Sequence, residues 1–419
     1  MREMKDSGIP CIGEVAEEFR VLRLKNVAEI LDQFRKPITA DQRNQDADVL
    51  YDYYGASGVI DKIDGYTIDD HVMLIGEDGA NLRMRNLPLM YEVNGKAWIN
   101  NHAHILKPKE NILFQYLFLT LEGLDINPYI TGSAQPKLNQ ENLKNIWLPV
   151  PPINVQQAIV DSLDREYEKV DMLIANVQTQ IEKLKAYKQS MISEAVTKGL
   201  DPTVPMKDSG LMWIGQIPAH WSISKVSMFF EVVLGKMLQP EKKTETDTYE
   251  NYLCAANVGN NCLKIDFLKQ MWFSEKDKQQ YCVRKGDLIV VEGGDVASCD
   301  IIKFEVQDLY IQNALHRVRA KKEALLEFLR YYLMMAKGQG YVDLICNKAT
   351  IAHFTKDKCM SLPLLVVPID EQREIVKYLD EKCDQIDKLI AIKQAKIEKL
   401  EQYKRSLIYE YVTGKKEVR

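Results

Sequence analysis

The sequence lacks any uninterrupted apolar run of the roughly 20 residues that a membrane-spanning helix requires. Its opening, MREMKDSGIP, is too charged and too broken for a signal peptide. It also lacks a low-complexity tract, and its 46% hydrophobic and 27% charged residues are those of an ordinary globular protein. These absences exclude a membrane protein and a disordered chain. We expect a folded cytoplasmic protein, and 419 residues leave room for roughly two to four domains.

Cysteine pairs of the CxxC type are absent, so the spacing typical of zinc and redox sites is missing. The eight cysteines are scattered along the chain and are Cys11, Cys254, Cys262, Cys282, Cys299, Cys346, Cys359 and Cys383. We expect them to be reduced structural thiols.

An excess of positive charge is also missing. The 55 Lys and Arg residues face 60 Asp and Glu residues, which gives a formal net charge of −5. Because nucleic-acid binders are usually basic, this balance argues against a nucleic-acid role without excluding it. A basic face requires the acidic residues to be segregated elsewhere.

The sequence motifs of catalysis are nearly absent. The chain has no Walker A run, no GxGxxG and no HExxH. Asn-Pro-Tyr at 127–129 resembles the NPPY loop of amino-methyltransferases, but it lacks one proline and has no glycine-rich cofactor loop upstream. His102 and His104 could suggest a metal, and the acidic stretches 77–79 and 292–295 a nuclease, but packing and turn roles are favoured. The sequence therefore predicts no catalytic residue and no metal site in this chain.

What the chain has instead is a repeat. Residues 152–197 match residues 368–413 at a constant shift of 216, with about half of the positions identical. Upstream, MKDSG recurs at 4–8 and 206–210. Each leader precedes a divergent region of about 130 to 150 residues and then a repeated helix. Two copies of one plan indicate pseudo-two-fold symmetry rather than a solenoid.

The repeated segments carry apolar residues at alternating steps of three and four, which is the pattern of a coiled-coil seam. Some forty residues without Gly or Pro predict a helix on the order of 60 Å long. We expect the two helices to pair with each other, and antiparallel pairing would hold the globular regions a fixed distance apart. The alternative is that they are core helices of a compact domain. The residues predicted to pair the helices are Leu163, Val170, Ile174, Val177, Ile181, Leu184, Leu379, Ile386, Ile390, Ile397 and Leu400.

The divergent regions, about 20–150 and 222–367, alternate short β-rich runs with turns and end in one helical stretch each. Both are predicted to be mixed α and β domains on one plan. A fainter echo places INNHAHILK at 99–107 over IQNALHRVR at 311–319. Their loops carry polar residues suited to base edges, which makes these candidate DNA contacts. The candidates are Arg83, Arg85, Asn100, Asn101, Lys137, Asn139, Gln312, Asn313, Arg317, Arg319, Asn347, Lys348 and Thr350.

This arrangement resembles the specificity subunits of Type I restriction-modification systems, and the resemblance covers nearly the whole chain. LPVPPINVQQAIVDSLD at 148–164 and VVPIDEQREIVKYLD at 366–380 are similar to that family's entry into its two helical spacers. WIGQIPAHW at 213–221 resembles the segment that opens its recognition domains. In the first copy this segment reads CIGEVAEEF, with Cys11 and Phe19 where tryptophans would stand.

The resemblance implies an α/β (α+β) fold with two target-recognition domains at 1–151 and 201–367, and two long antiparallel coiled-coil helices at 152–200 and 368–419. It implies a non-catalytic reader of double-stranded DNA, in which each domain reads one half-site and the helices set the spacer. Its implied partners are two methyltransferase subunits that bind S-adenosylmethionine, and restriction subunits that use ATP and Mg. No cofactor is expected on this chain.

Two rival interpretations remain open at this point. One is a restriction or modification enzyme that acts alone, which would need a cofactor loop or a carboxylate-lysine cluster. The other is a coiled-coil structural adaptor without a DNA role, which predicts no sequence-selective DNA binding even with partners present.

Overall fold

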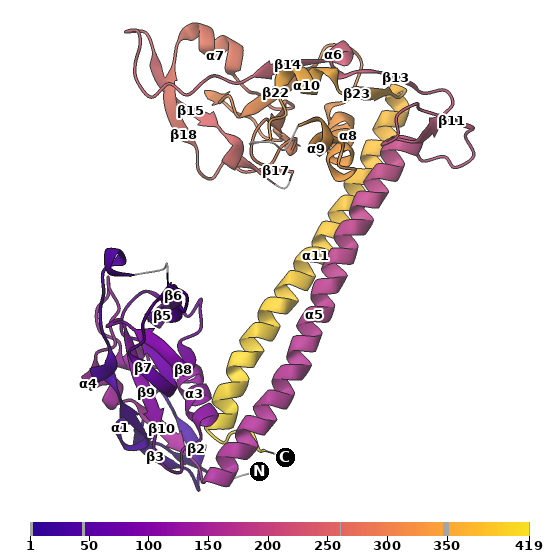
Figure 1. Ribbon diagram of the computed structural model, residues 1–419. Helices are drawn as coiled ribbons and strands as arrows, with labels where there is room; N and C mark the ends of the chain where they lie inside the picture. Colours follow the sequence, from indigo (N-terminus) through magenta and orange to yellow (C-terminus); the bar gives the residue numbers. More distant parts are fainter. Residues whose placement is uncertain (1–2, 44–46, 260, 347–351, 419) are drawn as a thin grey trace. The chain divides into compact units, whose positions relative to one another are not determined.

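The computed structural model describes residues 3–43, 47–259, 261–346 and 352–418 (Figure 1). The chain forms two compact units. Unit 1 contains residues 1–178 and 394–419, and unit 2 contains residues 179–393. Each unit holds one mixed α and β domain together with a part of both long helices. The predicted α/β class and tandem plan are confirmed.

The sheet of unit 1 has six strands in the order β4-β9-β7-β8-β5-β6, and only the β5–β8 pair is parallel. Unit 1 also has two antiparallel two-stranded sheets, β1–β2 and β3–β10. The strands are β1 (Met4–Asp6), β2 (Glu14–Ala16), β3 (Arg20–Arg23), β4 (Ala28–Ile30), β5 (Tyr51–Gly55), β6 (Gly58–Ile63), β7 (Ile68–Gly76), β8 (Met90–Ile99), β9 (Ala103–Pro108) and β10 (Trp147–Val150). The short helices are α1 (Leu24–Val27), η1 (Asp32–Phe34), η2 (Ala40–Gln42), α2 (Asn81–Met84), α3 (Phe114–Gly123), η3 (Asn127–Tyr129) and α4 (Gln140–Lys144).

Unit 2 repeats this plan with its sheet divided in two, ordered β14-β22-β19-β20 and β18-β15-β21. The β15–β21 pair is parallel, as is β5–β8 in unit 1. The strands are β11 (Met206–Asp208), β12 (Gln216–Pro218), β13 (Ser222–Lys225), β14 (Phe230–Leu234), β15 (Thr248–Leu253), β16 (Val258–Gly259), β17 (Cys262–Leu263), β18 (Lys269–Phe273), β19 (Leu288–Val291), β20 (Cys299–Ile301), β21 (Leu309–Ile311), β22 (Leu315–Ala320) and β23 (Pro363–Val366). The short helices are α6 (Val226–Phe229), η4 (Ala255–Asn257), α7 (Glu275–Tyr281), α8 (Leu326–Gly338), α9 (Tyr341–Ile345) and α10 (Lys356–Ser361).

The repeated segments form the long helices α5 (Ile153–Lys198) and α11 (Ile369–Val412), as predicted. Their contacts run antiparallel: in unit 2, Lys188 pairs with Asp387 at 2.6 Å, and Lys393 reaches back to Gln180. In unit 1 the pair is Lys404 with Asp171 at 2.7 Å. Asp171 and Asp387 occupy equivalent positions of the repeat, 216 residues apart, and so do Lys188 and Lys404. The same ion pair is therefore formed in both units.

The seam predicted from the heptads is mostly buried. In the described structure Ile174, Leu184, Ile390 and Leu400 are half-buried, and the rest are buried: Leu163, Val170, Val177, Ile181, Leu379, Ile386 and Ile397. Apolar burial along the seam is what stabilises a helix of this length, because helical propensity alone is weak.

Helices α3 and α8 each end in a glycine that lies close to a long helix, Gly123 to α11 and Gly338 to α5. A Cβ on Gly123 would lie 2.2 Å from Cγ2 of Ile408, and a Cβ on Gly338 would lie 1.9 Å from Nε2 of Gln189. At Gly123 the neighbour is the β-branched Ile408, so glycine is required there, whereas at Gly338 it is the far end of the flexible Gln189 side chain.

The proline-then-glutamine motif has a structural reason. Gln156 is buried, accepts a hydrogen bond from the Leu113 amide at 2.8 Å and donates to the Pro151 carbonyl at 2.9 Å. Gln372 likewise accepts a hydrogen bond from the Leu325 amide at 2.9 Å and donates one to the Val367 carbonyl. Since the Leu113 and Leu325 amides lie at the N-caps of α3 and α8, this glutamine ties each short helix to the start of a long one.

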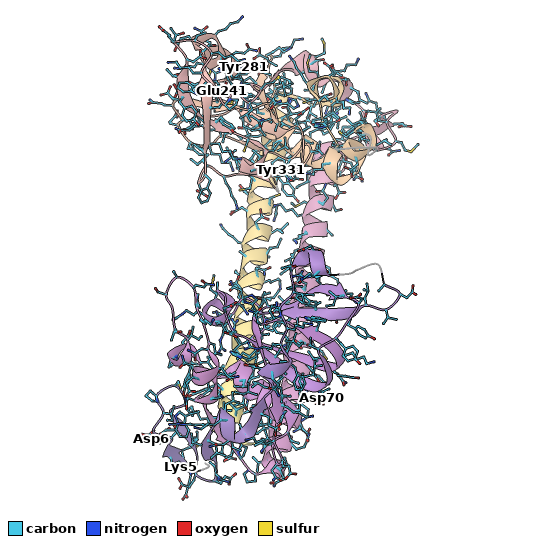
Figure 2. The ribbon with its side chains drawn as sticks, turned by 60° about the vertical axis from the view of Figure 1, so that its left-hand side comes forward. Lys5, Asp6, Asp70, Glu241, Tyr281 and Tyr331 are labelled. Carbon is cyan, nitrogen blue, oxygen red and sulfur yellow. The ribbon has the colours of Figure 1, made fainter. Side chains whose placement is uncertain are left out.

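A further tie is specific to unit 2. The Tyr331 hydroxyl of α8, labelled in Figure 2, donates to Asp380 of α11 at 2.6 Å. It joins the second domain to the long helix by a side-chain bond as well as by apolar packing.

Candidate nucleic-acid interface

Four segments of unit 1 that are far apart in sequence meet at one end of its sheet: 55–58, 77–80, 100–102 and 131–139. We call them the loop edge of unit 1. Backbone hydrogen bonds hold them together, from the Asn100 amide to the Tyr54 carbonyl at 3.1 Å and from the Glu77 amide to the His102 carbonyl at 2.7 Å. The Leu138 amide donates to the Glu77 carbonyl at 2.7 Å. The loops are therefore held in one arrangement by the backbone itself.

A buried network of polar side chains lies beneath the loop edge of unit 1, inside the domain. His104 lies with Nδ1 2.7 Å from Asp32 and Nε2 2.8 Å from the Leu138 carbonyl oxygen. Burial raises the pKa of Asp32, but the His104 hydrogen bond and the Arg35 charge outweigh it and lower this pKa. Burial likewise raises the pKa of Glu77, and hydrogen bonds from Arg35 and Lys137 overcome it and lower the pKa. The acids beneath the edge are thus ionised and matched by cations.

Unit 2 has a loop edge at the equivalent place, made of 235–239, 292–298, 312–314 and 353–354. The Phe354 amide donates to the Glu292 carbonyl at 2.7 Å, and the Asn313 amide to the Lys236 carbonyl at 2.9 Å. His316 lies 2.7 Å from the Phe354 carbonyl oxygen through Nε2, as His104 lies against Leu138 in unit 1. The weak sequence similarity between 99–107 and 311–319 thus reflects a histidine that contacts a loop carbonyl in both units, beneath two different surfaces.

The Nδ1 of His316 differs from its counterpart. In unit 1 Asp32 faces His104, whereas in unit 2 Leu234 stands opposite His316 in the β14–β22 register. The buried Nδ1 of His316 has no hydrogen-bond partner among the described residues. Burial therefore lowers the pKa of His316, with Lys356 adding to this effect and the Phe354 hydrogen bond and Glu292 opposing it.

We expect unit 2 to lose stability as the pH falls below the ordinary histidine pKa of 6.5. The unfolded chain then takes up a proton that the folded unit excludes, because the folded pKa is the lower one. The free energy of unfolding should fall by at most about 1.4 kcal/mol per pH unit until the folded pKa is reached. Urea unfolding at several pH values would measure this. His316→Gln is the control, and an equal pH slope in that variant would refute the assignment.

The predicted contacts of unit 1 fall into two groups. Asn101 and Lys137 are exposed on the loop edge, although Lys137 also lies 3.2 Å from Glu77. Arg83 is exposed outside the edge and donates to the Ile130 carbonyl at 3.0 Å. These three have polar atoms at the surface and stay candidates for DNA contact.

The other three serve the domain itself. Asn100 is buried and accepts a hydrogen bond from the His102 amide at 2.7 Å, and Asn139 caps α4. Arg85 donates to the carbonyls of Glu122 and Leu124 at 2.8 and 2.6 Å, and burial lowers its pKa. Their hydrogen bonds favour structural roles.

In unit 2, Gln312 and Asn313 lie half-buried on the loop edge. Arg317 is buried and donates to the carbonyls of Gln280 and Cys282, and Arg319 makes a bidentate pair with Asp287 at 2.5 and 2.7 Å. Both arginines act inside the domain. The remaining candidates, Asn347, Lys348 and Thr350, lie outside the described residues.

Sequence reasoning missed some side chains at these edges. His102 is half exposed and is held by Asp78 through its Nδ1 at 2.7 Å. Arg35 joins Asp32, Glu77 and the Asn101 carbonyl. The NNHAH run contains the signal for His102, for which the sequence favours a packing or hydrogen-bonding role over that of a metal ligand. In the described part of the chain no cluster of three His, Cys, Asp or Glu side chains is arranged for a metal ion.

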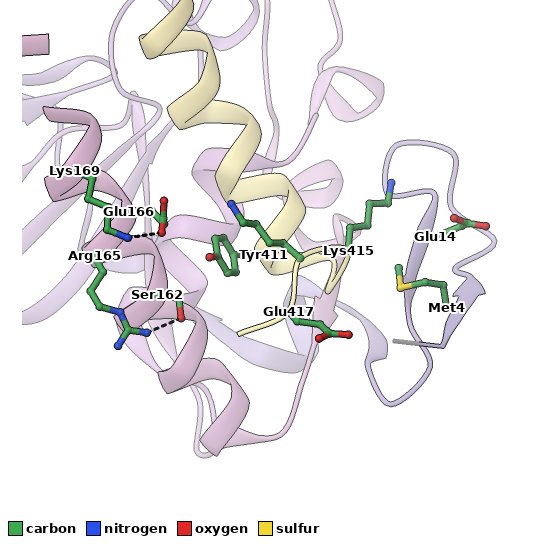
Figure 3. A pocket seen from close by; sticks show the side chains of 10 residues that line it. Met4, Glu14, Ser162, Arg165, Glu166, Lys169, Tyr411, Lys415 and Glu417 are labelled. Carbon is green, nitrogen blue, oxygen red and sulfur yellow. Dashed lines mark hydrogen bonds and ion pairs between the residues drawn. The ribbon is translucent and has the colours of Figure 1, made fainter. Parts of the chain in front are cut away.

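Each unit also has a groove beside the leader strands, called here the helix-end groove. In unit 1 it measures about 860 Å³ and is lined by Met4, Glu14, Ser162, Tyr411 and Lys415 among others (Figure 3). In unit 2 it measures about 640 Å³, and its lining includes residues at the matching positions of the repeat: Met206, Gln216, Tyr378, Ala195 and Gly199. The repeat therefore preserves a pair of grooves as well as a pair of helices.

Two mixed α and β domains, each built on a part of both members of a long antiparallel helix pair, define the class of protein. A model of the Type I restriction modification DNA specificity domain matches residues 16–183 and again residues 218–402. Because these matches cover most of the chain, the chain belongs to this family. Among the described residues no helix is both long and apolar enough to cross a membrane.

Two relatives illustrate the similarity. A putative type I restriction enzyme specificity subunit, S.HindORF215P of Haemophilus influenzae, is 24% identical over 360 residues, covering 85% of this chain and 86% of its own length. The putative type I restriction enzyme MjaX specificity subunit of Methanocaldococcus jannaschii is 26% identical over 440 residues, covering 96% and 95%.

A solved structure from work on complex assembly and conformational transition of the type I R-M system shares the fold. Its TM-score is 0.65 at 15% identity, with 95% of this chain and 98% of that chain covered. The tandem fold predicted from the sequence is therefore found in a protein of that system.

Proposed function

We propose that this chain is the non-catalytic DNA specificity subunit of a Type I restriction-modification complex, in which each domain reads one half of a bipartite site. One observation carries the proposal: the two units share a buried histidine beneath their loops and differ at their loop edges. His104 and His316 hold equivalent backbone carbonyls, yet the surfaces above them read Asn-Asn-His and Gln-Asn-Ala. A shared support under divergent loops suits a reader of two unequal half-sites.

The acidic net charge fits this function only if other subunits contribute basic groups that contact the DNA phosphates. Phosphate contacts supply much of the affinity for DNA, and they come from basic groups. At the unit 1 edge, Arg35 and Lys137 are already paired with Glu77. We propose that the loop edges supply base contacts and that the partner subunits supply much of the phosphate contact.

The partners we propose are two copies of one methyltransferase subunit, which would bind S-adenosylmethionine themselves, and restriction subunits that use ATP and Mg. Two features support equal partners. The helix-end grooves and the Asp171–Lys404 and Asp387–Lys188 pairs recur at matching positions. Features at equivalent positions of the two units suit two copies of the same protein.

The proposal is tested by sequencing methylated adenines in cells that express this chain with its neighbouring methyltransferase, beside cells that lack only this chain. We expect a bipartite motif with a fixed gap that disappears in the deletion strain. Methylation that does not depend on this chain would favour the helical adaptor, and methyl transfer by the purified chain alone would favour the stand-alone enzyme.

A further inference from the structure

Two large apolar side chains project next to each other from the loop edge of unit 2. Met237 is 76% exposed and Leu238 is 59% exposed. They follow β14 within the sequence GKMLQ. We call them the apolar tip. Single exposed apolar residues are common on protein surfaces, but an adjacent pair on a fixed loop calls for a reason.

The residues before the tip are fixed in place. A Cβ on Gly235 would lie 2.4 Å from the Gln312 carbonyl oxygen, so the chain passes directly against this loop. The Lys236 amide donates to the Ile311 carbonyl at 2.9 Å, and the Lys236 carbonyl accepts from the Asn313 amide at 2.9 Å. The Lys236 side chain is buried and forms an ion pair with Asp277 of α7.

The residues after the tip are fixed as well. Gln239 is buried, and its side-chain amide donates to Asp247 at 3.1 Å and to the carbonyl of Glu241, which is labelled in Figure 2. The Gln239 carbonyl accepts from the Trp272 amide at 3.1 Å. The apolar tip is thus held from both sides, and its exposure follows from the fold.

The tip lies beside the side chains that would read bases. Lys236, directly before it, exchanges backbone hydrogen bonds with the 311–313 loop that carries Gln312 and Asn313. In unit 1 the segment that follows β4 also exposes an apolar side chain, that of Phe34, which is 44% exposed. Apolar and amide side chains together suit one chemical surface, the major groove of DNA, where the thymine C5-methyl is the apolar group and the base edges accept and donate hydrogen bonds.

We propose that Met237 and Leu238 recognise thymine through its C5-methyl group in the half-site read by unit 2. This inference rests on the proposed function. It makes the apolar tip a determinant of specificity beside the amides of Gln312 and Asn313.

The test compares thymine with uracil, which differs only by the absent methyl group. The full chain, assembled with its modification subunits, binds duplexes carrying its methylated motif, with each thymine of one half-site replaced in turn. Exchange of residues 222–367 for a homologous module identifies the half-site of unit 2 as the one that changes. At one or more of its thymines we expect about fourfold weaker binding by the wild-type chain, the effect of one lost methyl contact.

In the double variant Met237→Ala, Leu238→Ala the same replacement should cause no further loss, because the methyl contact is already gone. Met228→Ala is the matched control: Met228 is 51% exposed on α6, at the opposite end of β14, and this variant should keep the fourfold effect. Binding that still depends on the remaining bases of the unit 2 half-site shows that unit 2 of the double variant is folded.

Three binding results would overturn the inference. They are a unit 2 half-site without thymine, a wild-type chain indifferent to every uracil, and a double variant that still loses fourfold. If the double variant instead fails to assemble with its partner subunits, the tip belongs to a protein interface and the inference is also wrong. A chain on which no methylated motif depends would refute the proposed function itself, which is a distinguishable outcome.

Discussion

Four residues inserted after Gln178 in α5, together with four inserted before Gln394 in α11, should lengthen the gap of the methylated motif by about two base pairs and leave both half-sites unchanged. Four helical residues add about 6 Å, and a base-pair step is about 3.4 Å. The original sites should lose methylation entirely. Sequencing of methylated adenines measures both results.

The matched insertion is chosen because the two helices run antiparallel within each unit. Gln178 ends the first segment of unit 1 and Gln394 opens its second, so both insertions fall between the units and spare the Lys188–Asp387 and Lys404–Asp171 pairs. A four-residue insertion after Lys322, in the exposed loop between β22 and α8, is the control and should keep the original gap. Altered half-sites with an unchanged gap would contradict a helical spacer.

Replacement of Trp221 by alanine should destabilise unit 2 by about 3 to 5 kcal/mol, as expected for a large buried aromatic side chain. Trp221 is completely buried, its indole N–H donates to Glu371 at 2.9 Å, and it packs against Gly199 at the end of α5. Urea unfolding followed by circular dichroism, with proteolysis to locate the unfolded unit, measures the change.

The chain supplies the control for this experiment. Phe19 occupies the matching position in unit 1, is also completely buried, and lies against Gly414 beyond the end of α11. Trp221→Phe should therefore cost clearly less than Trp221→Ala, because an aromatic ring still fills the site. Equal losses for the two variants would show that the Glu371 hydrogen bond, and not packing, decides stability here.

The regular parts of the fold could be predicted well. The long helices follow from the spacing of residues such as Leu163 and Ile181, which repeats over many turns and so outweighs local exceptions. Gln156 and Gln372 are identical residues in the two copies of the repeat, but the sequence does not show the hydrogen bonds that they make to the short helices.

The exposure of the candidate DNA contacts could be predicted only in part. Arg85 and Arg317 look like surface cations in the sequence, but in the structure they satisfy carbonyls inside the domains. Asn100 is a candidate base contact in the sequence, and in the structure its side chain accepts a hydrogen bond from the His102 amide. The same polar side chain serves either purpose, and the choice depends on which backbone atoms of distant segments lie next to it.

The sequence by itself determined the duplication, the paired helices and the family, because these depend on periodicity and on residues kept in both copies. Only the tertiary structure decided which side chains are free to meet a ligand. Met237 and Leu238 would be assigned to a core by their chemistry, yet hydrogen bonds on both sides hold them at the surface. Exposure is set by contacts between segments far apart in the chain, and local sequence does not contain those contacts.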